Sequence, residues 1–197
     1  MAEDLNDLLD VLKIEKAHIL GYSMGGYIAQ EFALAFPKRV DRLILLATGP
    51  YIDGYGRAVV SSWIDVRSSS MSREQIARHN APWLYSPELL DNHERYEQAI
   101  RNSLANRWEQ EDHAFIRQAQ AILAWDPGNQ ASGIKAPTLI VAGEDDILVP
   151  ARNAEALGKL IPGSTVKLLP GGHVGCIEHA SEYNAAFLEH LGAAVTA

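Results

Sequence analysis

The sequence contains Gly21-Tyr22-Ser23-Met24-Gly25, and this stretch decides which fold it predicts. The stretch has the pattern G-x-S-x-G, and it lies directly after a short apolar run and directly before a helical apolar pattern. A tight turn from strand to helix would strain the serine backbone, and the flanking glycines leave room for close chain approach. The serine oxygen would then project near a helix N-terminus, which favours negative charge. Ser23 is therefore a candidate nucleophile.

Four short apolar runs predict the strands of a sheet. They are bounded by turn residues, as buried strands usually are. The runs are 17–20, 43–47, 138–142 and 165–169. Helical apolar patterns alternate with them, which predicts βαβ units and a parallel sheet covered by helices on both faces. The sequence thus predicts an α/β fold with about four strands.

The stretch 49–130 differs from the segments around it. It has no strand-like run, it is rich in Arg, Glu and Gln, and it contains all four tryptophans. Ser72 begins a pattern typical of a capping box, and Ser86 fits an N-cap that is followed by proline at the first helical position. We therefore expect a helical insertion over 49–130 between the second and third strands. The core domain would comprise 1–48 and 131–197.

Two further segments supply candidates for a base and an acid. A serine hydroxyl is a weak nucleophile unless a base stands beside it. His173 follows the fourth predicted strand, and Asp145 and Asp146 follow the third. Open α/β sheets bind their ligands at the carboxyl ends of their strands, where these residues would meet Ser23. The sequence thus predicts a group of serine, histidine and one of two neighbouring aspartates.

Taken together, these motifs resemble those of the α/β-hydrolase family. The matching stretches are 21–26 with 36–40, 136–150 and 171–178. They are similar to the branch with a helical cap, which includes esterases, lactonases and carbon–carbon bond hydrolases. The resemblance covers essentially the whole chain, although the insertion is similar only in type. The order and spacing of the motifs are specific for the fold and poorly specific for the substrate.

The resemblance implies roles for four residues. Ser23 would be the nucleophile, His173 the general base, and Asp146 the carboxylate that orients the imidazole. Asp146 is preferred to its neighbour because the family places the acid four residues before a proline. The backbone N–H of Met24 would donate a hydrogen bond to the oxyanion. The resemblance implies no cofactor and no metal.

These roles imply a serine hydrolase that cleaves a carboxylic ester, a lactone or a related acyl substrate through an acyl-enzyme. A carbon–carbon bond hydrolase or a perhydrolase would use the same three residues, so both remain open. A hypothesis of another class is a truncated chain that is catalytically inactive. The predicted partner is a small acyl substrate.

The resemblance also leads us to expect that part of the family fold is missing. The family sheet has eight strands with the serine after the fifth, whereas one helix and one strand precede Ser23. In the family a loop that bears His-Gly donates the second oxyanion hydrogen bond, and no His-Gly dipeptide occurs here. The strand 17–20 would then be an open sheet edge, so we expect self-association or a homo-oligomer through it.

Composition argues against several other functions. The 197 residues carry a formal net charge of −8, which does not favour nucleic acid or an anionic membrane surface. No apolar run approaches the ~18 residues of a membrane span. No paired spacing of metal ligands occurs. The single Cys176 cannot form an intramolecular disulfide and the acidic start lacks a signal-peptide pattern, so we expect a cytoplasmic protein.

Overall fold

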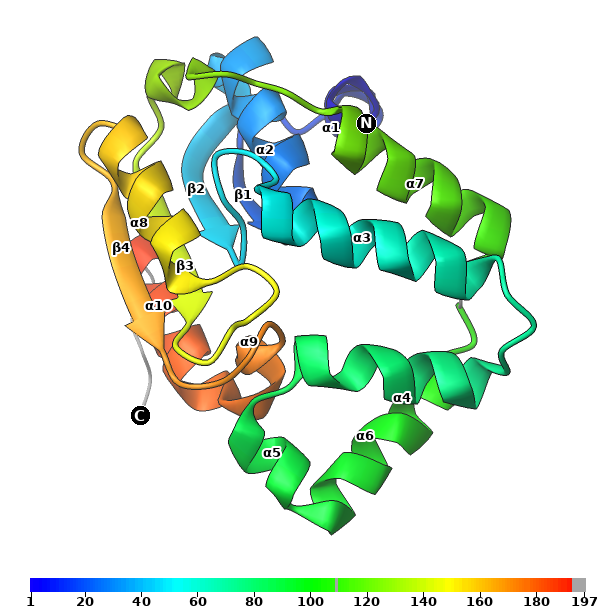
Figure 1. The fold of residues 1–197 in the computed structure, drawn as a ribbon. Helices are drawn as coiled ribbons and strands as arrows, with labels where there is room; N and C mark the ends of the chain where they lie inside the picture. The colour runs from blue at the N-terminus through cyan, green and yellow to red at the C-terminus, as the bar shows by residue number, and fades with distance from the viewer. Residues whose placement is uncertain (109, 193–197) are drawn as a thin grey trace.

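The computed structural model describes residues 1–108 and 110–192. The described residues form a four-stranded sheet in which neighbouring strands are parallel and the strand order follows the sequence, β1-β2-β3-β4 (Figure 1). The strands are β1 (Ala17–Tyr22), β2 (Val40–Leu46), β3 (Thr138–Gly143) and β4 (Thr165–Leu169). The predicted α/β fold with a parallel sheet flanked by helices is confirmed.

The helices fall into two groups. Those outside the connection from β2 to β3 are α1 (Ala2–Val11), α2 (Met24–Ala35), α8 (Ala151–Leu160), α9 (Gly175–Glu178) and α10 (Ala180–Leu191), with a 3-10 turn at η1 (Pro37–Arg39). Those within it are α3 (Gly54–Arg67), α4 (Arg73–Leu84), α5 (Pro87–Asp91), α6 (His93–Leu104) and α7 (Asp112–Ala124), followed by the 3-10 turn η2 (Gln130–Gly133). Within the described ranges, no helix has both the length and the apolar composition needed to cross a membrane.

Two apolar layers enclose the sheet, because alternate residues of its central strands face opposite sides. Leu43 and Leu45 of β2 pack with apolar residues of α1, α2 and α8. Ile44, which lies between them, packs against Tyr183 of α10. A strand that is buried on both faces needs apolar residues at successive positions, which explains the unbroken apolar run of β2.

The helices α3 to α7, which we call the cap helices, lie beside the sheet (Figure 1). The Ser72 hydroxyl accepts the N–H of Gln75, and the Gln75 side chain accepts the N–H of Ser72, so the predicted capping box begins α4. The Ser86 hydroxyl accepts the N–H of Leu89 and so caps α5. Residues of α3 and α7, including Val60 and Ala119, share an apolar cluster. The division of the chain into a core domain and an insertion at 49–130 stays a prediction.

β1 lies at one edge of the sheet that the described residues form, and β4 lies at the other. An edge strand presents backbone groups to which another chain can add. Leu20 on β1 is 49% exposed, and Leu8 and Val11 of α1 and Leu12 directly after it are also exposed. The edge and these apolar side chains support the proposal that the chain self-associates there.

We expect these 197 residues to form concentration-dependent oligomers in sedimentation velocity. Leu20→Lys should shift the population towards monomer, because a charged side chain on an edge strand opposes strand addition. The matched control is Leu168→Lys, which changes a partly exposed leucine on the opposite edge strand. A monomer at every concentration, or an effect of the Leu168 variant alone, would contradict this interface.

Candidate active site

Ser23 occupies the turn between β1 and α2 with a left-handed backbone. Its φ is 52° and its ψ is −118°. Such a conformation costs a residue other than glycine about 1–3 kcal/mol. The Ser23 N–H donates to the carbonyl oxygen of Leu46 over 2.9 Å, which fixes the turn to β2. The serine is therefore held at the carboxyl end of the sheet, in the predicted context of strand, turn and helix.

Two glycines permit the close packing of this turn. A Cβ at Gly21 would lie 2.4 Å from the carbonyl oxygen of Gly25, and a Cβ at Gly26 would lie 2.5 Å from Cγ2 of Thr48. A Cβ at Gly25 would meet no atom within 4 Å. The motif predicts crowding at Gly21 and Gly25, but the crowded positions are Gly21, which faces the carbonyl of Gly25, and Gly26, which faces Thr48.

Three side chains from separate loops form one chain of hydrogen bonds. Ser23 Oγ lies 2.9 Å from His173 Nε2, and His173 Nδ1 lies 2.8 Å from Asp146 Oδ2. With a neutral imidazole, the serine hydroxyl donates to Nε2 and the Nδ1–H donates to the carboxylate. His173 and Asp146 are each 3% exposed, so the pair is shielded from bulk water. Charge interactions are stronger in such surroundings.

The backbone of the loop after β3 determines which aspartate reaches the imidazole. Oδ1 of Asp146 accepts the N–H of Leu148 over 2.9 Å and the N–H of Val149 over 2.8 Å, which leaves Oδ2 for the histidine. Asp145 is exposed, and its own N–H donates to the carbonyl oxygen of Gly171. The structure therefore brings Asp146, and not Asp145, to the imidazole.

The loops that follow β3 and β4 are in direct backbone contact. A Cβ at Gly143 would lie 2.3 Å from the carbonyl oxygen of Gly171 and 2.4 Å from that of Gly172. Gly171 has a φ of 105°, which side chains other than glycine rarely adopt. This contact places the loop that bears the aspartate against the loop that bears the histidine.

Met24 begins α2 directly after Ser23. The N–H groups of a first helical turn have no acceptor within the helix, and the helix N-terminus carries partial positive charge. Met24 also lines the cavity beside Ser23. Its N–H therefore lies directly beside Ser23, at a helix N-terminus that favours negative charge.

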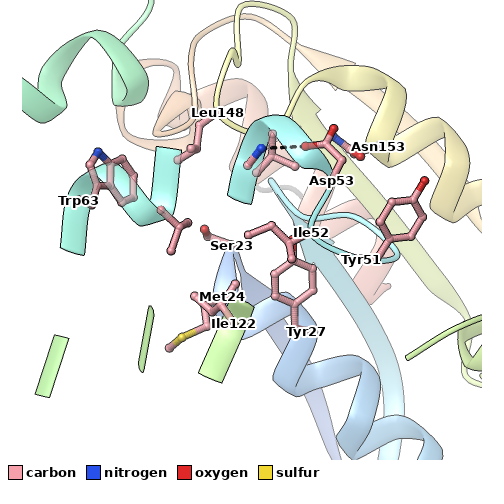
Figure 2. A pocket seen from close by; sticks show the side chains of 13 residues that line it. Ser23, Met24, Tyr27, Tyr51, Ile52, Asp53, Trp63, Ile122, Leu148 and Asn153 are labelled. Carbon is pink, nitrogen blue, oxygen red and sulfur yellow. Dashed lines mark hydrogen bonds between the residues drawn. The ribbon is translucent and has the colours of Figure 1, made fainter. Parts of the chain in front are cut away.

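An apolar cavity of about 70 Å³ lies beside Ser23 (Figure 2). Its walls come from the turn after β1, the start of α2, the loop that leads into α3, α3 itself, α7, the loop after β3 and the start of α8. The lining residues are Ser23, Met24, Tyr27, Tyr51, Ile52, Asp53, Gly56, Val60, Trp63, Ile122, Leu148, Val149 and Asn153. Among these lining residues Asp53 is the one ionised side chain at neutral pH, and none is a lysine or an arginine.

Asp53 carries a fixed negative charge at the cavity wall, next to Asn153 in Figure 2. Its Oδ1 accepts the N–H of Gly56 over 2.8 Å, which caps α3, and its Oδ2 pairs with Arg152 over 3.0 Å. Burial raises the pKa of Asp53, but these hydrogen bonds outweigh it and hold the pKa below its usual value. The carboxyl is therefore ionised at neutral pH.

Two tyrosines near the site stay protonated. Burial, with a smaller contribution from Asp53, raises the pKa of Tyr27 to about 12. Burial also raises the pKa of Tyr22, and the nearby Cys176 and Asp146 add to the effect. The Tyr22 hydroxyl donates to the carbonyl oxygen of His173 over 3.3 Å. Tyr22 thus holds the backbone of the histidine from the side of the sheet.

The ionisable side chains of this region are not arranged as a metal site. In residues 1–108 and 110–192, no group of three or more His, Cys, Asp and Glu side chains is placed to hold a metal ion. Burial raises the pKa of the Cys176 thiol. The thiolate, which is the form that binds metals, is therefore disfavoured at this position.

The aromatic residues of the cap helices differ in their relation to the site. Trp63 lines the cavity, whereas Trp108 is 77% exposed. Trp125 packs on Tyr27 with ring centroids 4.5 Å apart, and Trp83 packs on another tyrosine of the cap helices. The sequence placed all four tryptophans in one insertion but gave no signal for which one lines the cavity. It also gave none for the other lining residues of the cap region, because packing between distant segments decides their positions.

Comparison with known proteins shows to which family the chain is related. A family model described as alpha/beta hydrolase fold matches residues 1–180. The chain is 28% identical to a Yersinia enterocolitica protein provisionally named as the carbamate hydrolase RutD, and the match covers 97% of the chain and 68% of that protein. It is 30% identical to a 2-hydroxy-6-oxononadienedioate/2-hydroxy-6-oxononatrienedioate hydrolase of Paraburkholderia phymatum, over 97% of the chain and 67% of that protein.

A solved structure of a hydrolase is also similar to this chain. The crystal structure of a hydrolase from Pseudomonas aeruginosa matches with a TM-score of 0.85 and 28% identity, over 98% of this chain and 71% of that chain. The family match extends over most of the sequence, and the parallel strands and the turn at Ser23 are those expected from the family motifs. This chain therefore belongs to the alpha/beta hydrolase fold family and is a hydrolase.

Proposed function

We propose that this hydrolase cleaves a carboxylic ester, a lactone or a related acyl substrate, with Ser23 as its nucleophile. The observation that carries the proposal is the chain of hydrogen bonds from Ser23 Oγ through His173 to Asp146. A hydroxyl that is hydrogen-bonded to a buried imidazole with a carboxylate behind it is activated for attack on a carbonyl carbon. The acyl group would be held on Ser23 as an ester, and this reaction requires no cofactor.

The proposed reaction has two halves. His173 Nε2 takes the hydroxyl proton as Ser23 Oγ bonds to the carbonyl carbon, and the carbonyl oxygen becomes an oxyanion. The imidazolium, stabilised by Asp146, then gives this proton to the leaving alcohol. In the second half, His173 takes a proton from water, the hydroxide attacks the acyl-enzyme, and the proton returns to Ser23 Oγ. Each half moves one proton through one nitrogen, which the 2.9 Å distance between Oγ and Nε2 supports.

The family pattern has two hydrogen-bond donors to the oxyanion, and these residues alone provide fewer. The N–H of Met24 and the N-terminus of α2 supply one donor and a favourable dipole. The loss of a single oxyanion donor typically costs on the order of 10²–10³ in rate. We therefore expect slow turnover from the 197 residues by themselves. An inactive chain is the rival hypothesis.

The cavity favours a small, uncharged acyl group. Its volume of about 70 Å³ is small beside the roughly 300–1,000 Å³ of typical ligand sites, so a short acyl chain fits better than a long one. Apolar side chains form most of its wall, and Asp53 adds a negative charge that its ion pair with Arg152, which does not line the cavity, offsets in part. A substrate with a carboxylate near its acyl carbon would be repelled there.

A carbon–carbon bond hydrolase or a perhydrolase with the same three residues is the second candidate. One relative is named for a dioate substrate. A dioate carries two carboxylates, and the charge of Asp53 disfavours such a molecule in this cavity. The electrostatics of the wall therefore support the ester or lactone reaction over that particular carbon–carbon cleavage. We place the reaction in the cytoplasm as part of the same proposal, because a chain with a single cysteine, Cys176, suits a reducing compartment.

Ser23→Ala tests the nucleophile. With p-nitrophenyl acetate, the variant should lose about 10³-fold in rate, down to the level of the buffer, because the attacking oxygen is gone. Ser61→Ala on the exposed side of α3 is the matched control and should keep the wild-type rate. Equal rates for the wild type and the Ser23 variant would contradict the proposal and favour the inactive chain.

Asp146→Asn tests the acid, and the neighbouring Asp145→Asn is its control. An asparagine keeps the shape of the side chain but cannot stabilise the imidazolium, so kcat should fall by up to about 10⁴-fold. Asp145→Asn should leave kcat within about twofold, because that side chain is exposed. Steady-state kinetics with one ester measure kcat for both variants and show which aspartate supports the imidazole. The assignment fails if the Asp145 variant is the slower of the two.

Asp53→Asn tests the proposed selectivity for uncharged acyl groups. Wild-type protein should prefer a p-nitrophenyl butyrate to the corresponding succinate monoester, and Asp53→Asn should reduce this preference by about 10-fold, since roughly 1.4 kcal/mol of repulsion is removed. Asparagine is also a good N-cap, so α3 should keep its stability. The measurement is the ratio of kcat/KM values for the two esters. A ratio that does not change would exclude Asp53 as the cause.

A further inference from the structure

Glu178 lies at the end of α9, and its carboxylate accepts four hydrogen bonds from uncharged groups. Oε1 accepts the N–H of Gly172 over 3.2 Å and the N–H of Ser86 over 3.1 Å. Oε2 accepts the hydroxyl of Ser86 and, over 3.3 Å, the same N–H. Gly172 directly precedes His173, and Ser86 is the N-cap of α5. One carboxylate therefore joins the cap helices to the loop that bears the histidine.

A second contact joins the same two segments on the other side of the histidine. The N–H of Val174 donates to the carbonyl oxygen of Leu84 over 3.0 Å. A Cβ at Gly172 would lie 2.7 Å from the carbonyl carbon of Tyr85, so the two backbones touch. The end of α4 accordingly lies beside α9 in Figure 1. We call residues 84–86 the cap segment, and it holds the backbone immediately before and immediately after His173.

The orientation of the imidazole depends on that backbone. Its Nδ1 lies 2.8 Å from Asp146 and its Nε2 lies 2.9 Å from Ser23, so both ring nitrogens must be placed at once. The Tyr22 hydroxyl holds the carbonyl oxygen of His173 from the side of the sheet. The cap segment and Glu178 supply the contacts from the opposite side.

We propose that Glu178 is a positioning residue that fastens the cap segment to the loop of His173, so that the imidazole faces Ser23 and Asp146 at the same time. Glu178 acts through the N–H of Gly172, which it holds in place. Without the carboxylate, that N–H and both donors of Ser86 lose their acceptor, and the loop loses its support. A displacement of about 1 Å far from the reacting atoms can cost about 10²-fold in rate. The effect on rate rests on the proposed function, whereas the effect on geometry does not.

The geometry is tested first, by a readout that needs no turnover. The proton on His173 Nδ1, hydrogen-bonded to Asp146, should give a far-downfield proton resonance that disappears in His173→Ala. Glu178→Ala should shift or abolish this resonance, and Glu178→Gln should keep it, because the glutamine oxygen still accepts from Gly172 and Ser86. Glu182→Ala is the matched control on the exposed first turn of α10 and should leave the resonance in place.

Steady-state kinetics test the expected effect of Glu178 on catalysis. With rates expressed per titrated active site, Glu178→Ala should lower kcat by about 10- to 100-fold with KM nearly unchanged, and Glu178→Gln should recover most of the loss. A purely structural role would lower the folded fraction without changing kcat per active site. An unchanged resonance together with unchanged kcat in the alanine variant would overturn the proposal.

The resonance also tests the proposal if the wild-type chain is inactive or if the alanine variant does not fold. If the wild-type chain shows the resonance but hydrolyses no ester, the proposed function fails and the resonance alone decides on Glu178. If Glu178→Ala does not fold, Ser86→Ala replaces it, since that variant removes one donor and leaves the carboxylate in place. It should move the resonance in the same direction by a smaller amount, and an unmoved resonance would overturn the proposal.

Discussion

The backbone contact between the loops after β3 and β4 is the constraint on which the site depends. Gly143 lies so close to the carbonyl oxygens of Gly171 and Gly172 that a side chain has no room there. Because β3 and β4 are adjacent and parallel, their carboxyl ends deliver an aspartate and a histidine to the same edge of the sheet. A larger residue at position 143 would separate the two loops and would therefore disturb the buried pair between Asp146 and His173.

Sheet order explains why the histidine needs support from outside the sheet. The serine follows β1 and the histidine follows β4, so two strands lie between them. At about 4.8 Å per strand, β1 and β4 lie roughly 14 Å apart. Residues 170–174 follow β4 through bends and turns and carry the histidine towards the serine. Tyr22 on one side and the cap segment on the other hold the backbone at the histidine.

Much of this arrangement could be predicted from the sequence, because it follows from local patterns. The apolar runs predicted the strands, and the motif around Ser23 with the acid and the histidine after later strands predicted which loops meet. The spacing before Pro150 in the family pattern favoured Asp146 over Asp145, and in the structure the N–H groups of Leu148 and Val149 hold the Asp146 carboxylate in place. The cavity wall and the contacts of Glu178 escaped prediction for a different reason. They depend on the packing of segments far apart in the chain, which leaves no periodic signal.

The left-handed backbone of Ser23 sets stability and catalysis against each other at a single position. Glycine alone adopts that conformation without cost, so replacement of this serine by glycine would relieve strain while it removed the hydroxyl of the proposed nucleophile. A laboratory selection for heat resistance without a demand for turnover would therefore enrich glycine at position 23. At this position the chain therefore gives up backbone stability to carry a hydroxyl at the carboxyl end of the sheet.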